Sequence, residues 1–282
     1  MNTVKRQLGL SLIELLIALA ISSLLILGIT QVYIDNKRNY VFQQNQAGNL
    51  ENGRFASLML NEYLGRAGYR RDPVLLVEEA FPSQDADGDC MAFNAGHSIT
   101  GLDPDVGRGF CIRYQPKTSG ELDCQGAASA SFDDTVAFSS PPTSSMLILA
   151  FKYEPSADND LPSGRLLCKN LNATSPRYGE LLRGVADMRL DFGVGNSDVL
   201  GKEVTGYVPQ ADWTATSGSI RSVRYSLLMA SRSGQRDSDD SQILDDWLTT
   251  ATDDDKTRLQ NADSRRLYQV TSSTQTVRNL MP

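Results

Sequence analysis

The sequence of 282 residues is poor in the groups on which many enzymes and metal sites depend. It contains a single histidine, His97, which excludes a zinc site or a catalytic mechanism that needs two imidazole groups. It also lacks a basic excess, since 27 lysines and arginines stand against 34 acidic residues and leave a net charge of -7. This sign of charge does not suit binding along a phosphate backbone, so we expect no nucleic-acid partner.

Catalytic motifs are missing as well. The sequence has no Gly-x-Ser-x-Gly, no phosphate-binding glycine loop and no Cys-x-x-Cys pair. Ser98 follows His97 directly, but adjacency in sequence gives no nucleophile-base geometry. We therefore expect a protein that is not an enzyme and that needs no cofactor.

One acidic stretch has the alternation of carboxylates with which a calcium loop begins, at Asp85, Asp87 and Asp89. The rest of that motif is absent, because the twelfth position is Gly96 where a bidentate glutamate is required. A solvated acidic turn is the favoured interpretation, with a calcium site as the weaker alternative and no other metal site expected.

The N-terminus has the order of a membrane anchor. Residues 1–9 contain Lys5 and Arg6 without any acid, and residues 10–32 are apolar with Glu14 as their single ionisable group. As a helix, such a segment is roughly 34 Å long and can cross a hydrocarbon layer of about 30 Å. The positive residues keep the N-terminus in the cytoplasm, so the remainder of the chain is expected outside.

Three other interpretations of this segment compete. A secretory signal peptide could end at the small residues Ala18 to Ala20, a plain signal anchor could hold the chain, or the helix could lie in a protein core. Glu14 would interrupt the apolar region of a signal peptide. In a plain signal anchor its carboxylate has no purpose and adds a cost to membrane insertion. A core helix rarely begins nine residues into a chain behind a basic leader.

The string from Gly9 to Ala18, GLSLIELLIA, closely resembles the prepilin cleavage motif of type IV pilins and type II secretion pseudopilins. The resemblance implies that a prepilin peptidase cuts after Gly9 and that Leu10 becomes the N-methylated first residue. It also makes Glu14 the fifth mature residue. Family pilins usually have phenylalanine where this chain has Leu10.

The chemistry of Glu14 indicates a role in assembly. A carboxylate in lipid needs a cation or hydrogen-bond donors, and no lysine or arginine lies within helical reach of Glu14. Cleavage after Gly9 creates an α-amine at the membrane edge, which in a staggered bundle can reach the carboxylate of a neighbour. We interpret Glu14 as the residue that sets the register between subunits.

The helical pattern continues beyond the membrane segment, with no proline before Arg71. An apolar face is predicted from Phe55, Leu58, Met59 and Tyr63, and Gly65 and Gly68 then end the pattern. We thus expect a leader at 1–9, a transmembrane and filament-core helix segment at 10–32, the amphipathic half of the same helix at 33–64, and a globular β-rich periplasmic domain at 65–282. Residues 51–56, 66–69 and 277–280 also resemble PilW-like minor pilins.

Short β-rich segments follow Pro73 and are separated by glycine, proline, serine and aspartate. Strands are predicted at 109–115, 135–139, 146–153, 165–169, 188–192, 223–230 and 265–279. One short helix is expected at 243–251, within an acidic exposed loop over 237–255. The fold class is α+β and pilin-like, with a long N-terminal helix whose first half spans the membrane and whose second half packs on a mainly antiparallel sheet.

All four cysteines lie in the part expected to be exported, where an even number favours disulfides. The candidates are Cys90, Cys111, Cys124 and Cys168. Three pairings are open. The short interval between Cys111 and Cys124 favours a bridge between these two, which leaves Cys90 with Cys168.

The resemblance implies a minor pilin that primes or caps type IV pili and so supports twitching motility and adhesion. Its implied partners are other minor pilins, the major pilin, the prepilin peptidase, the inner-membrane assembly platform and a tip adhesin. The implied location is the inner membrane, crossed once with the N-terminus cytoplasmic and the C-terminal domain periplasmic, and then the pilus tip. A type II secretion minor pseudopilin is the first alternative, and an anchored periplasmic binding protein or hydrolase is the second.

Overall fold

A computed structural model describes residues 11–280 except 158–159, 197–200 and 202. The chain divides into two compact units, with the boundary between Asn45 and Gln46. The first nine residues and Leu10 lie outside the described part, so the predicted leader and cleavage site are not placed.

The described part of the first unit is helical. Helix α1 runs over Leu12–Arg66, and its residues up to Asn45 belong to this unit. An 18-residue window of α1 has a mean hydropathy of 2.6, with no part of it buried, so this helix is long and apolar enough to cross a membrane. Within the described residues, the prediction of one long helix over 10–64 is confirmed, and α1 continues through Gly65.

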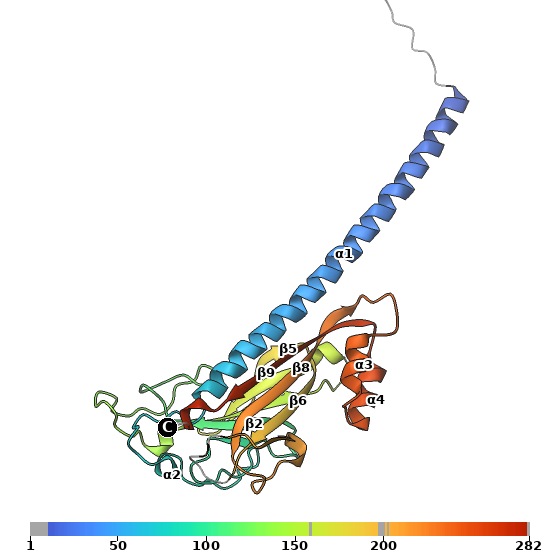
Figure 1. Ribbon diagram of the computed structural model, residues 1–282. Coiled ribbons are helices and arrows are strands. Elements are labelled where there is room, and N and C mark those ends of the chain that lie inside the picture. The colour runs from blue at the N-terminus through green and yellow to red at the C-terminus, as the bar shows by residue number, and fades with distance from the viewer. Residues whose placement is uncertain (1–10, 158–159, 197–200, 202, 281–282) are drawn as a thin grey trace, which may run out of the picture. The chain divides into compact units, whose positions relative to one another are not determined.

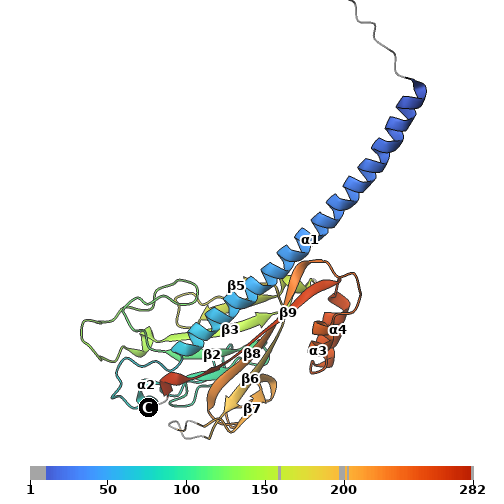
Figure 2. The ribbon, with the colours of Figure 1, turned by 45° about the horizontal axis from the view of Figure 1, so that its top comes forward.

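The second unit contains two antiparallel sheets where a single sheet was expected (Figures 1 and 2). One sheet has the order β1-β2-β3-β4-β5, formed by Ile99–Gly101, Arg108–Tyr114, Leu147–Glu154, Arg165–Asn170 and Gly179–Arg183. The other has the order β7-β6-β8-β9, formed by Gly206–Pro209, Val185–Val194, Ile220–Gly234 and Arg266–Thr276. The predicted α+β class with antiparallel pairing is confirmed.

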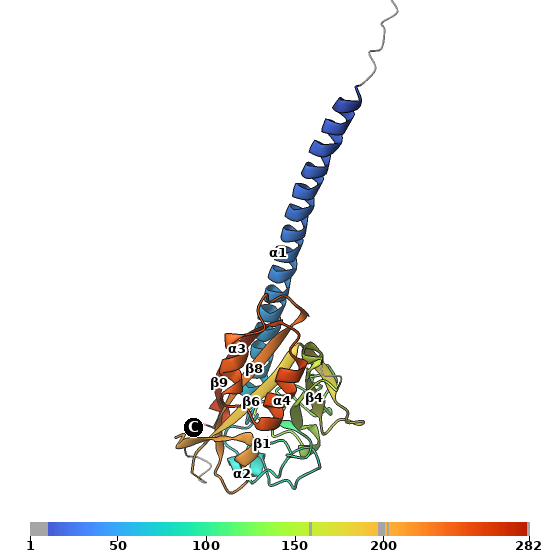
Figure 3. The ribbon, with the colours of Figure 1, turned by 90° about the vertical axis from the view of Figure 1, so that its right-hand side faces the viewer.

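The described residues of this unit form three further helices. They are α2 (Val77–Ala80), α3 (Gln242–Leu248) and α4 (Asp253–Ala262). Short 3-10 turns occupy Thr143–Ser145, Leu161–Ser163, Gln210–Asp212 and Arg278–Leu280. Helices α3 and α4 lie beside β6 and β8 (Figure 3), where Trp247 and Leu259 pack against Leu228 in a small apolar cluster.

The end of α1 packs on the sheets through a different face from the predicted one. Its buried residues are Asn49, Gly53, Ala56, Leu60 and Leu64, which recur every three or four positions. Gly53 and Ala56 have little or no side chain, so the backbone of α1 can approach the sheet closely at this face. A Cβ atom on Gly53 would lie 2.3 Å from the side-chain oxygen of Thr271 in β9.

Two large apolar residues of α1 therefore remain outside the core. Phe55 and Leu58 are 50% and 62% exposed, although the sequence predicted them on the packed face. Met59 and Tyr63 are partly buried against the main core, where the Tyr63 and Phe151 rings lie 5.3 Å apart. The prediction was wrong for Phe55 and Leu58, because side-chain size alone does not reveal which stripe a sheet accepts.

Of the seven strand predictions, six are confirmed, among them the last as β9, and one is wrong. Segments matching β2, β3, β4, β6 and β8 all form strands, and β8 lies inside its sheet between β6 and β9. Residues 135–139 form a turn instead, with Phe138 at a φ of 59°. A left-handed residue cannot continue a strand.

The acidic stretch 237–255 is also more structured than a loop. Helix α4 begins within it, and the Thr252 hydroxyl caps this helix by accepting from the Asp255 amide. Its first turn carries Asp253, Asp254 and Asp255, where negative charge is favoured by the helix dipole. The short helix expected at 243–251 is present as α3.

Two disulfides are present, as predicted, but their pairing differs. Cys90 is bonded to Cys111 and Cys124 to Cys168, with Cα atoms 5.9 and 6.4 Å apart. The expected Cys111–Cys124 bridge is wrong because the chain after β2 leaves the sheet in a long excursion and does not turn back at once. Cys90 instead pairs with Leu102 in an isolated β-bridge just beyond the end of β1. Because β1 is the neighbour of β2 in the sheet, this pairing brings Cys90 close to Cys111 in β2.

Candidate functional site

The first described turn of α1 is built around Glu14. The Ser11 amide donates a hydrogen bond to the Glu14 carboxylate at 3.2 Å. The Ser11 carbonyl accepts the first helical bond from the Leu15 amide, also at 3.2 Å. Ser11 is thus the residue before the helix and Glu14 its third residue, the spacing of a capping box. This local donor was not expected, although Ser-x-x-Glu is a signal visible in the sequence.

One neutral donor does not balance the charge on Glu14. Among the residues that the structure describes, no salt bridge joins a cation to this carboxylate. In the lipid layer a carboxylate without a counter-charge is costly, by about 2.5 to 3.5 kcal/mol at a helix centre. The arrangement therefore leaves Glu14 able to accept a further, positively charged donor.

The side chains that follow Glu14 form an apolar surface on every side of α1. Leu24, Leu27 and Ile29 are 69%, 67% and 68% exposed. The hydroxyls of Ser23 and Thr30 donate to carbonyls within the helix at 2.8 and 2.7 Å, so they need no water. A helix that is apolar all round must be covered by lipid or by other helices.

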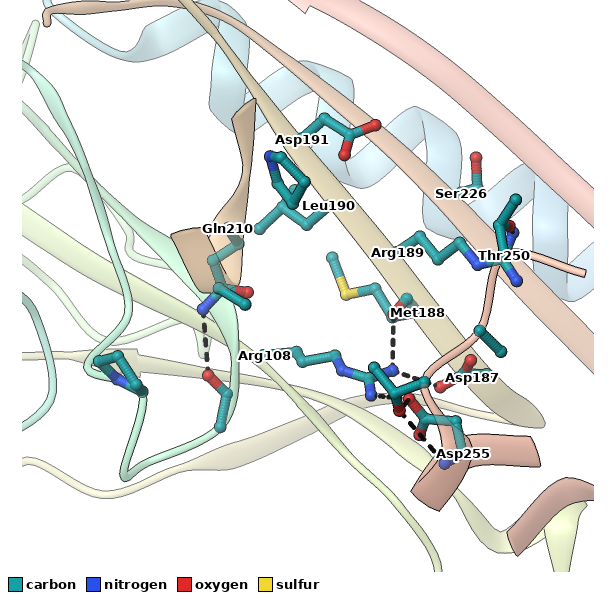
Figure 4. A pocket seen from close by; sticks show the side chains of 16 residues that line it. Arg108, Asp187, Met188, Arg189, Leu190, Asp191, Gln210, Ser226, Thr250 and Asp255 are labelled. Carbon is teal, nitrogen blue, oxygen red and sulfur yellow. Dashed lines mark hydrogen bonds and ion pairs between the residues drawn. The ribbon is translucent and has the colours of Figure 1, made fainter. Parts of the chain in front are cut away.

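The second unit contains a pocket of about 790 Å³ between β6, the turn after β7 and the segment joining α3 to α4 (Figure 4). Asp187 lies at its base with a side chain that is only 1% exposed. Its carboxylate accepts from Arg108 at 2.7 Å, from Arg258 at 2.9 Å and from the Trp247 ring nitrogen at 2.8 Å. Arg108 also donates to Asp255.

These contacts satisfy the carboxylates. Burial raises the pKa of Asp187, against the opposing charge of Arg108. Burial also acts to raise the pKa of Asp255, but the Thr252 hydroxyl and the Arg108 guanidinium outweigh it and lower that pKa. Every donor around Asp187 belongs to a fixed side chain from β2, α3 or α4, so the cluster ties these elements to β6. It has the character of a structural network and not of a general acid-base pair.

His97 meets a serine other than its sequence neighbour. Its Nε2 atom lies 2.9 Å from the hydroxyl oxygen of Ser219, whereas the Ser98 hydroxyl is buried with no hydrogen-bond partner among the described residues. Burial lowers the pKa of His97, and the charges of Arg221 and Arg113 lower it further. A histidine that acts as a base in a triad is oriented by a carboxylate, and here its charged neighbours are cations.

In the acidic stretch considered for calcium, Asp87 and Asp89 bind groups of the protein itself. Asp87 accepts from the amides of Asp89 and Cys90 at 3.1 and 2.9 Å, which closes a turn. Asp89 forms an ion pair with Lys169 and accepts from the Tyr178 hydroxyl at 2.9 Å. Across the described part of the chain, no group of three metal-ligating side chains is placed to hold an ion.

Comparisons with known proteins address both ends of the chain. The family described as type IV pilus-assembly protein W matches residues 155–279. Over this part, the chain is similar to the PilW family. The prokaryotic N-terminal methylation motif matches residues 4–30, which include Gly9, Leu10 and Glu14. The predicted resemblance is confirmed at the N-terminal motif and near the C-terminus, whereas residues 51–56 and 66–69 lie outside both matches. The PilW match also covers strands in which the sequence alone showed no likeness.

Structural similarity is more distant. A type IV-like pilin from Thermus thermophilus has 12% sequence identity and a TM-score of 0.40, with 84% of this chain and 98% of that chain covered. Among curated proteins, none matches significantly. The two family matches therefore make the chain similar to type IV pilus-assembly proteins over residues 4–30 and 155–279, and α1 is long and apolar enough for a membrane anchor.

Proposed function

We propose that this PilW-like chain is a minor pilin, a non-enzymatic subunit that primes or caps the type IV pilus and is stored in the inner membrane before assembly. The observation that carries the proposal is the single carboxylate of Glu14 at the start of an exposed apolar helix. Its backbone donor supplies no positive charge, so a cation from a neighbouring subunit completes the site.

The source of that cation follows from the methylation motif. Cleavage after Gly9 places the new α-amine of Leu10 next to Ser11, at the same helix end as Glu14. Within one subunit, the Glu14 carboxylate already accepts a hydrogen bond from the Ser11 amide. In a bundle of staggered helices, the amine of one subunit meets the carboxylate of another, which both neutralises the charge and fixes the axial register.

The second unit supports the proposal of a non-enzymatic subunit. Asp187 is held by Arg108 and Trp247, and His97 meets the Ser219 hydroxyl, an arrangement that fits a structural role. The partners that this role requires are the prepilin peptidase, the assembly platform and other pilins. The resulting location is the inner membrane, with the N-terminus cytoplasmic and the domain periplasmic, and then the pilus.

The decisive experiment is deletion of the gene with two readouts, surface pili and secreted enzymes. We expect pili to be lost and secretion to continue. Loss of secretion with normal pili would identify a type II secretion pseudopilin, and no change in either would favour an anchored periplasmic protein. Complementation with the intact gene is the control, because it separates the loss of this subunit from effects on neighbouring genes.

A further inference from the structure

The turn over residues 133–139 presents apolar side chains to solvent in a fixed conformation. Val136 and Phe138 are 57% and 68% exposed. This stretch belongs to the green loops at the left of the domain in Figures 1 and 2, beyond the ends of β2 and β3. We call residues 133–139 the Phe138 knob. An exposed aromatic ring at the tip of a loop adds nothing to the core of its own domain.

The backbone of the Phe138 knob is strained. The Ser139 amide bonds to the Val136 carbonyl at 3.4 Å, which closes a four-residue turn with Phe138 at its third position. Phe138 has a φ of 59°, a region that glycine and asparagine occupy readily but a bulky side chain does not. Stability alone would favour a small or polar residue here, so the aromatic ring at this position carries a local cost.

Arg71 holds the knob in place from inside. Its guanidinium donates to the carbonyls of Asp134 and Val136 at 2.7 and 3.1 Å and to the Ser139 hydroxyl at 3.0 Å. It also lies over the Phe132 ring, 5.2 Å from the centroid. The loop is therefore ordered before any partner arrives, which removes part of the entropic cost of binding.

A second exposed apolar segment follows Arg71 in the chain. Val74 and Leu76, three and five residues after Arg71, are 88% and 62% exposed. Together, residues 72–79 and the Phe138 knob contain five carboxylates and no lysine or arginine. Arg70 and Arg71 donate to the carbonyls of Leu75 and Asp134, inside these segments, so the five carboxylates outnumber the two cations and leave an excess of negative charge beside the apolar tips.

We propose that the Phe138 knob docks into an apolar pocket on another pilus subunit, and that lysine or arginine side chains border this pocket. The charge selects this occupant, because the carboxylates are repelled by anionic lipid and by a second copy of an acidic chain. A fixed aromatic residue entering a pocket is the usual form of an interface hot spot. The inference rests on the proposed function in one respect, that the partner belongs to the same pilus.

Photocrosslinking in cells tests the contact directly. The full-length chain carries p-benzoylphenylalanine at position 138, and a control carries it at position 243, where Ile243 is 43% exposed on α3. We expect a single adduct from position 138 with a subunit that also has an N-terminal methylation motif, and no such adduct from position 243. We also expect the adduct to weaken at least tenfold when Glu78 and Glu79 are both changed to lysine.

Three results overturn the proposal: no adduct from position 138, an adduct with a second copy or with lipid, or equal adducts from both positions. The Phe138→Asn variant supplies a second test, since asparagine tolerates the left-handed backbone. We expect it to fold with unchanged or higher thermal stability and to reduce surface pili at least tenfold, while Ile243→Asn leaves pili unchanged. Normal pili in Phe138→Asn would refute the knob but leave the minor pilin proposal standing, because that proposal depends on deletion of the gene.

Discussion

Replacement of Asp187 by asparagine is the sharpest test of the network beneath the pocket. The carboxylate is 1% exposed and accepts from Arg108, Arg258 and Trp247 at 2.7, 2.9 and 2.8 Å. An asparagine keeps the shape but has one acceptor oxygen, so its amide nitrogen must face at least one of these donors. Removing one partner of a buried ion pair costs about 3 to 5 kcal/mol, and we expect Asp187→Asn to lower the free energy of unfolding by that amount.

The assay is urea unfolding of the full chain in non-ionic detergent, followed by tryptophan fluorescence. Trp247 is a direct reporter because its ring nitrogen donates to Asp187. The matched control is Glu180→Gln on β5, whose side chain is 33% exposed and pairs with Arg183, where a surface ion pair contributes about 0 to 1 kcal/mol. If Asp187→Asn unfolds within 1 kcal/mol of the wild type, as a surface pair would, the cluster does not hold β6 to its neighbours.

Two further predictions concern pH and helix packing. Because the pKa of His97 is lowered from 6.5 in the folded protein, the unfolded chain binds more protons, and stability falls as pH drops below about 6.5. The His97→Gln variant should lose this part of the pH dependence in thermal melts between about pH 5 and 6.5, and an unchanged slope would assign it to other groups. Gly53→Val places a side chain against Thr271 and should destabilise the second unit by about 1 to 3 kcal/mol in the same urea assay. Gly48→Val, where a Cβ meets nothing within 4 Å, should change little, and equal effects at both sites would contradict the observed packing.

The features predictable from the sequence are those set by local patterns. The length of α1 follows from an unbroken run without proline, and β8 follows from a continuous apolar segment that belongs between two other strands. The capping box at Ser11 and Glu14 was equally visible, since Glu14 lies three positions after Ser11. The N-terminal site is therefore readable almost entirely from its first turns.

Features that depend on distant parts of the chain could not be read in this way. The partners of Arg108 lie 79 and 147 positions away, at Asp187 and Asp255, and no spacing rule connects them. The disulfide pairing failed for the same reason, because strand order and not sequence interval decides which cysteines meet. The prediction of the packed face of α1 was wrong because it relied on large apolar side chains. The helix approaches β9 at Gly53, where the lack of a side chain makes room for Thr271.

The central claim is that Glu14 pairs with a cation on a neighbouring subunit, and it is tested by recovery of the protein in sheared pili. Glu14→Gln preserves an oxygen acceptor for the Ser11 amide but removes the charge, whereas Glu14→Ala removes both. An ion pair at about 4 Å contributes about 4 kcal/mol at an effective dielectric constant of about 20, equivalent to roughly a thousandfold in incorporation. We predict that both variants are cleaved normally after Gly9 and that both are missing from sheared pili. Wild-type recovery of Glu14→Gln would show that the carboxylate only caps its own helix and would contradict the account.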